Sequence, residues 1–183
     1  DLKFTSKNYR TLEVKVGDSL VKFRAFEKIV YVANPIEPDY QTLNIYVLEA
    51  YFKGEKINGY SAETAPIFLP NAVGGYMPAK AATYDAKGFG SGDKPNAIMI
   101  ALSKGYVVAS VGARGRTLEK DGKYTGKAPA AIVDLKAAVR YLHANDSVMP
   151  GDAKKIISNG TSAGGALSAL LGASGDSNDY IDY

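Results

Sequence analysis

The sequence contains no cysteine and a single histidine among its 183 residues. The absence of cysteine excludes disulfides, cysteine-ligated zinc sites and thiol nucleophiles. No apolar run approaches the roughly 20 residues that a membrane-spanning helix requires. The sequence does not have the positively charged start followed by an apolar stretch that is typical of a signal peptide. We therefore expect a soluble protein with no membrane partner, in a compartment, cytoplasmic or secreted, that the composition leaves open.

Neither sign of charge is in large excess, since the formal net charge is only +3. The basic residues are scattered and do not form the stripe that is typical of nucleic-acid-binding proteins. No cluster of acidic residues and histidine has metal-ligand spacing. The segment Gly122–Ala128 hints at a phosphate-binding loop, but its two glycines are one residue too close together. The sequence thus predicts no nucleic-acid partner, no metal and no cofactor.

The first part of the chain has the pattern of β-strands. Polar and apolar residues alternate at 11–16 and 20–32, with a Gly17-Asp18 turn between the two runs. Further strands are expected at 42–50 and 67–70. The last of these is continuously apolar, as in strands that are buried on both faces.

Strands and helices alternate in the second part. Helices are expected at 94–105 and 128–146, strands at 106–112 and 155–158, and a final helix from Ala163. An antiparallel β entrance followed by this alternation predicts the α/β class with a mainly parallel sheet.

A glycine-flanked serine stands between the last expected strand and the last expected helix. Gly160-Thr161-Ser162-Ala163-Gly164 fits G-x-S-x-G, the nucleophile elbow of α/β-hydrolases. Gly160 and Gly164 let the strand and helix approach closely, and the tight turn lifts the Ser162 hydroxyl clear of the sheet. The Ala163 N–H, at the helix N-terminus, is the expected first oxyanion-hole donor. The alternative is a helix-capping serine whose glycines serve packing alone.

A second glycine motif follows the apolar strand at 67–70. In α/β-hydrolases the second oxyanion N–H comes from the loop after the third strand. Gly74 and Gly75 occupy that loop; we favour the Gly75 N–H as the donor and take Gly74 as a candidate substrate-side residue. The alternative is a glycine hinge in an ordinary loop.

Two arginines, Arg114 and Arg116, follow the strand at 106–112 and therefore begin at the same edge of the sheet. Arg114 is a possible substrate-side residue, because a guanidinium there could contact an acidic or phenolic ligand. More often such arginines fix neighbouring loops by pairing with carboxylates, and we favour that alternative.

The partners of Ser162 are not apparent. In α/β-hydrolases an acid and then a histidine follow the serine in the chain, whereas His143 precedes Ser162. We expect His143 at the margin between its helix and the sheet and without a catalytic role. The aspartates after Ser162 (Asp176, Asp179 and Asp182) are expected to be solvated. Residues 1–183 then form a partial α/β-hydrolase domain with about the first five strands, without the later strands and lid. The acid, the histidine and the lid are expected on a separate segment or a second chain.

Four stretches closely resemble bacterial tannases (tannin acyl hydrolases), which are serine esterases related to feruloyl esterases. They are "APIFLPNAVGGYMP", "KGYVVASVGARGRT", "KAPAAIVDLKAAVRYL" and "MPGDAKKIISNGTSAGGALSALLGASG". The resemblance implies a bacterial protein that hydrolyses galloyl esters, with Ser162 as the nucleophile and Gly75 and Ala163 as oxyanion donors. It also implies that the acid, histidine and gallate contacts come from a lid insertion and a C-terminal part.

Two other functions remain open. A feruloyl or general carboxylesterase would share the chemistry and differ in acyl-pocket residues, most of which are expected outside this chain. A non-catalytic binding module or pseudoenzyme would keep the half-fold, and its Ser162 would not react with a serine-directed phosphonate.

Overall fold

Six strands form one mixed sheet in the computed structural model, which describes residues 2–88 and 92–182. Their order across the sheet is β1-β2-β3-β5-β4-β8. The strands are β1 (Arg10–Val16), β2 (Ser19–Val30), β3 (Thr42–Leu48), β4 (Pro66–Pro70), β5 (Val107–Val111) and β8 (Asp152–Asn159). The pairs β1–β2, β2–β3 and β3–β5 are antiparallel, whereas β5–β4 and β4–β8 are parallel.

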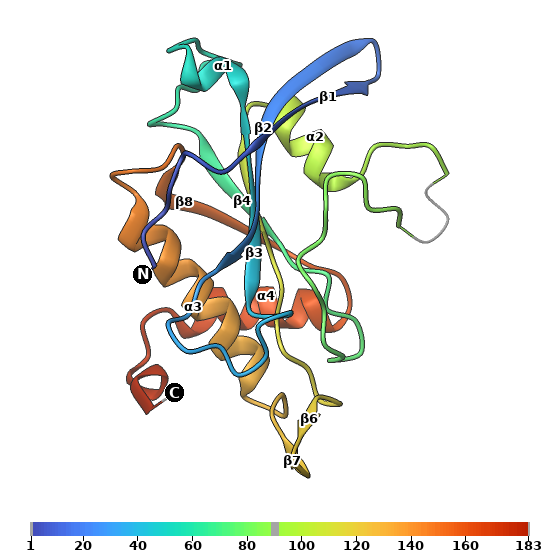
Figure 1. The fold of residues 1–183 in the computed structure, drawn as a ribbon, viewed down its shortest axis with the longest axis vertical. Coiled ribbons are helices and arrows are strands. Elements are labelled where there is room, and N and C mark those ends of the chain that lie inside the picture. The colour runs from blue at the N-terminus through green and yellow to red at the C-terminus, as the bar shows by residue number, and fades with distance from the viewer. Residues whose placement is uncertain (1, 89–91, 183) are drawn as a thin grey trace.

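The helices are α1 (Glu49–Phe52), α2 (Ala97–Ser103), α3 (Ala130–Asn145) and α4 (Ala163–Ser174), followed by the 3-10 helix η1 (Asn178–Asp182). In Figure 1, α2 and α3 lie to either side of the central strands, and α4 packs with α3 and β8. Among the described residues, none of the helices has both the length and the apolarity that crossing a bilayer would require.

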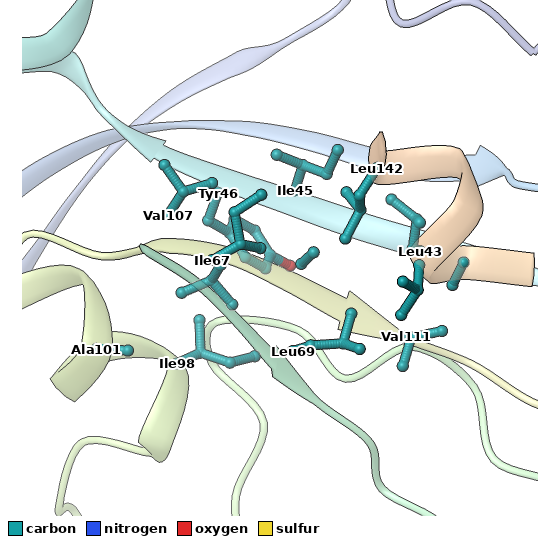
Figure 2. Packing of buried hydrophobic residues seen from close by; sticks show 14 of the residues in the cluster. Leu43, Ile45, Tyr46, Ile67, Leu69, Ile98, Ala101, Val107, Val111 and Leu142 are labelled. Carbon is teal, nitrogen blue, oxygen red and sulfur yellow. The ribbon is translucent and has the colours of Figure 1, made fainter. Parts of the chain in front are cut away.

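The core lies where helices from both sides meet the central strands. Every residue of β5 is buried, as are Leu43, Ile45 and Val47 of β3. Figure 2 shows Leu142 of α3 beside Leu43, and Ile98 of α2 on the other side of these strands. Burial on both faces explains the continuous apolar runs of β4 and β5.

The predicted α/β class is confirmed, because the sheet is mixed and strands alternate with helices in the second half. The expectation of a mainly parallel sheet is wrong, because β1–β2, β2–β3 and β3–β5 pair antiparallel and only β5–β4 and β4–β8 pair in parallel. Each of the six strand ranges expected from the sequence has its strand in this sheet, one more than the expected count of about five. The expected strand at 42–50 ends at Leu48, where α1 begins. The loop after β5 contains a small ribbon of β6 (Glu119–Lys120) and β7 (Lys123–Tyr124).

The parallel pairing of β4 with β8 positions the candidate site. Pro70 lies opposite Asn159 at the carboxyl ends of the two strands. The loop that begins at Asn71 and the turn that begins at Gly160 therefore start side by side. In open α/β sheets this edge is where ligands bind.

Candidate active site

Ser162 has a backbone conformation that side chains other than glycine rarely adopt. Its φ is 55° and its ψ is −123°, and it stands between the last residue of β8 and the first turn of α4. Such strain costs about 1–3 kcal/mol and persists only where the surroundings impose it. The side chain makes no helix-capping hydrogen bond, which argues against the capping alternative, and the residue is exposed.

The glycines of the turn are required by close packing. A Cβ on Gly160 would lie 2.3 Å from the Gly164 carbonyl oxygen and 2.8 Å from the Asn71 side-chain nitrogen. A Cβ on Gly164 would lie 2.6 Å from Asn71 Oδ1 and 2.8 Å from the Val73 carbonyl oxygen. Real Cβ atoms essentially never approach that closely, so the strand and the helix can meet here only through glycine.

Two hydrogen bonds fasten the turn to the helix. The Gly164 N–H donates to the Thr161 carbonyl at 3.0 Å, and the Ala166 N–H donates to the Ser162 carbonyl at 3.0 Å. Ala163 is the first residue of α4, so its own N–H has no acceptor within the helix. The positive end of the helix dipole adds to the attraction of this N–H for an anionic oxygen.

The loop after β4 makes a tight turn. The Met77 N–H donates to the Gly74 carbonyl at 3.0 Å, while Gly75 and Tyr76 both have positive φ values of 58° and 56°. Arg116 holds this turn from the β5 loop: its backbone N–H donates to the Tyr76 carbonyl and its Nε to the Gly75 carbonyl, both at 2.9 Å. Arg116 thus fixes a loop, as we favoured for arginines at this edge.

Arg114 is nearly buried and pairs with the fully buried Asp134 of α3. Its guanidinium donates to both carboxylate oxygens, at 2.8 to 3.1 Å, and to the Thr125 carbonyl at 3.1 Å. Gln41 also donates to Asp134, at 3.0 Å. These contacts favour the structural alternative, and a role for Arg114 in substrate contact remains a prediction.

His143 is exposed in the last turn of α3, not packed at the margin of the sheet as expected, because its neighbours Tyr141 and Leu142 face the core instead. The helix ends near the start of β8, whereas Ser162 follows the opposite end of that strand. Asp176 accepts a salt bridge from Lys136 at 2.7 Å, which lowers the pKa of its carboxyl. Asp179 accepts a hydrogen bond from Ser177, and the side chain of Asp182 lies outside the described residues.

Asn71 joins the two loops and was not singled out from the sequence. Its side chain is buried between the Ser162 turn and the loop of Gly75, and it contacts Gly160 and Gly164. A lone asparagine after a strand has no sequence signal that separates it from an ordinary turn residue. The one sequence signal is the pair of glycines, Gly160 and Gly164. Their missing side chains leave space that another side chain must fill, but the sequence does not say which one.

The arrangement can present a hydroxyl beside two backbone segments that carry N–H groups. Ser162 is exposed at the carboxyl edge of the sheet, Ala163 opens α4, and Gly75 lies in the adjoining loop, which is also exposed. Such a grouping suits attack on a carbonyl carbon with stabilisation of its oxygen. Within the described residues, no three acidic or histidine side chains come together as metal ligands would.

The comparisons with known proteins agree with this geometry. A family model described as BD-FAE matches residues 79–182, and the chain belongs to this family. No curated protein matches the sequence. The tannase of Fusobacterium nucleatum is 62% identical to this chain, with a TM-score of 0.96, and the match covers 100% of this chain and 38% of that protein.

Two further tannase structures give the same result. A tannase from Lactobacillus plantarum is 43% identical, with a TM-score of 0.91, and the match covers 100% of this chain and 39% of that one. A tannin acyl hydrolase in complex with ethyl gallate is 44% identical, with a TM-score of 0.90, over 99% of this chain and 39% of that one. The resemblance to bacterial tannases is confirmed, and the chain spans about two fifths of their length.

The packing of the turn gives a test with two glycines of the same helix. Gly164→Ala should lower the free energy of unfolding by about 1–3 kcal/mol, because the added Cβ overlaps Asn71. Gly172→Ala places its Cβ in open space, and should raise stability by up to about 1 kcal/mol through helix propensity. Urea unfolding measures both. Equal shifts in the same direction would show that Gly164 has no special packing role.

Proposed function

We propose that this chain is the nucleophile-bearing part of a tannase-type serine esterase that hydrolyses galloyl esters and releases gallic acid. The observation that carries the proposal is the strained Ser162 backbone at the junction of β8 and α4. The tannase structures support the choice of substrate, since a protein 44% identical to this chain binds ethyl gallate. The predicted nucleophile elbow is thus the centre of the proposed site.

The reaction would proceed in two steps. Ser162 Oγ attacks the ester carbonyl carbon while a base accepts the hydroxyl proton, and the alcohol leaves with a proton to give an acyl-enzyme. Water, deprotonated by the same base, then attacks the acyl carbon and releases the acid and the free serine. In both steps the N–H groups of Gly75 and Ala163 stabilise the negative oxygen.

We further propose that another segment supplies the base, its acidic partner and the lid, and covers α4. No residue of α4 is charged, yet Ala166, Ala169 and Leu170 are exposed. A helix that is apolar all round is ordinarily buried. Among the described strands β8 also lies at the edge of the sheet, and its Ile157 is 42% exposed. Natural proteins rarely leave such an edge uncovered.

A feruloyl or general carboxylesterase is the second candidate, and the match to the BD-FAE family model fits a relation to feruloyl esterases. Both activities use the same Ser162 chemistry and differ in the acyl pocket. Comparison of kcat/KM for a galloyl and a feruloyl ester of the same alcohol separates the two.

Ser162→Ala should abolish ester hydrolysis in the active protein without loss of fold, with a decrease in kcat of at least about 10³-fold. His143→Gln serves as the control and should leave kcat nearly unchanged, because His143 lies near the opposite end of β8. Steady-state kinetics and circular dichroism measure both variants. Substantial turnover in Ser162→Ala would remove Ser162 as the nucleophile, and a collapse in His143→Gln would identify a base that we exclude.

Gly75→Ala should lower kcat by roughly 10- to 10²-fold while KM changes little, because an oxyanion donor contributes about 3 kcal/mol in the transition state. Alanine at a φ of 58° strains the peptide that carries this N–H. Gly74→Ala should have the smaller effect, since its Cβ meets open space and its φ is not positive. A change confined to KM would make Gly75 part of the binding wall instead.

The 183-residue chain by itself should be inactive on galloyl esters and prone to association, because we expect the base on another segment and because α4 and the β8 edge are exposed. Addition or fusion of the complementary segment should restore both turnover and a defined size, over a contact of roughly 2,000 Å² or more. An ester assay and light scattering measure these properties. A monomeric chain with full turnover would mean that the base lies within it.

A further inference from the structure

We propose that Asn71 is the positioning residue that holds the Gly75 loop in register with the Ser162 turn. The inference rests on the proposed function, because the register matters only if both segments act on one oxygen. Asn71 follows β4 directly, and it is 9% exposed. It lies where the two carboxyl strand ends meet.

The side-chain amide of Asn71 faces both segments. On one side, Nδ2 donates to the carbonyl of Asn159 at 3.1 Å, to the carbonyl of Gly164 at 3.2 Å and to Ser168 Oγ at 3.2 Å. On the other side, Oδ1 accepts the Val73 N–H at 3.3 Å. The amide donors therefore bind the end of β8 and the start of α4, while the acceptor binds the loop that leads to Gly75.

The positions of these contacts in the chain explain why they matter. Gly164 follows Ala163, the first expected oxyanion donor, and Val73 precedes Gly75, the second, by two residues. The β4–β8 ladder ends at Pro70 and Asn159, and the Asn71 N–H extends it by one bond, at 2.9 Å, to Asn159. Beyond that bond, the hydrogen bonds of the Asn71 side chain connect the loop after β4 to the start of α4. Two donors on separate segments must be held to within about 0.5 Å to act together.

The glycines of the turn fit the same interpretation. The Cβ that Gly160 or Gly164 lacks would occupy the space of the Asn71 amide. These glycines thus admit a polar side chain between β8, α4 and the β4 loop, in addition to letting the chain turn. A residue without both a donor and an acceptor could fill that space but could not bind both sides.

The test is Asn71→Asp, measured in the active protein. Aspartate keeps the size and the acceptor for Val73, but it places a carboxylate oxygen against the Asn159 and Gly164 carbonyls. We expect kcat to fall by about 10- to 10²-fold with KM within a few-fold, as for a small misplacement of catalytic groups. Ser162 should still react with a serine-directed phosphonate, but more slowly.

Asn145→Asp is a matched control. Asn145 is a buried asparagine of α3 that accepts the Phe4 N–H at 2.7 Å and donates to the carbonyls of Leu2 and Tyr141 at 3.0 and 2.9 Å. It has the same kind of contacts near the opposite end of β8. Its replacement should lower stability while leaving kcat per folded molecule unchanged.

Three outcomes would overturn the inference. Unchanged kcat in Asn71→Asp, or an equal loss in Asn145→Asp, would leave Asn71 a residue of stability alone, with the proposed function intact. Absence of phosphonate labelling in the wild-type protein would remove the proposed function and this inference together. If Asn71→Asp does not fold, Asn71→Ser gives the same comparison, because its hydroxyl retains an acceptor for Val73 but is too short for Gly164.

Discussion

The structure depends on how sharply β8 turns into α4. The chain reverses over Gly160, Thr161 and Ser162, and Ser162 is held at a φ of 55°. Nothing local to serine favours that conformation, which costs about 1–3 kcal/mol. The cost is offset by the contacts around it: the parallel ladder of β4 and β8, the first hydrogen bonds of α4 and the Asn71 amide between them. The strained serine is therefore a property of three elements together.

A second set of contacts fixes the loops beside this turn. Asp134 of α3 anchors Arg114 at the start of the β5 loop, and two residues later Arg116 binds both carbonyls of the Gly75 turn. The buried Asp134 of α3 is thus connected, through the loop that carries Arg114 and Arg116, to the turn whose Gly75 N–H we propose as an oxyanion donor. Truncation of either member of this buried pair would leave an unpaired charge, which is strongly destabilising.

The sequence alone predicted the features that depend on local residue patterns. The α/β class, the strand–turn–helix around Ser162 and the glycine loop after β4 follow from periodicity and glycine spacing. The contacts that join distant segments were not predictable, because Arg114 and Asp134 are 20 residues apart, and Asn71 and Gly164 are 93 apart. The exposure of His143 depends on its angular position around α3, directly after the buried Tyr141 and Leu142, and the spacing of apolar residues alone does not fix that position at the boundary of the buried face.

The central claim is that the strained serine is a nucleophile. Its most direct test is reaction of the active protein with a serine-directed fluorophosphonate, followed by proteolysis and mass spectrometry of the peptides. We predict a single adduct on Ser162, formed at a rate that a galloyl ester reduces by competition. An intact protein without an adduct on Ser162, or an adduct elsewhere that accounts for the loss of activity, would contradict the account.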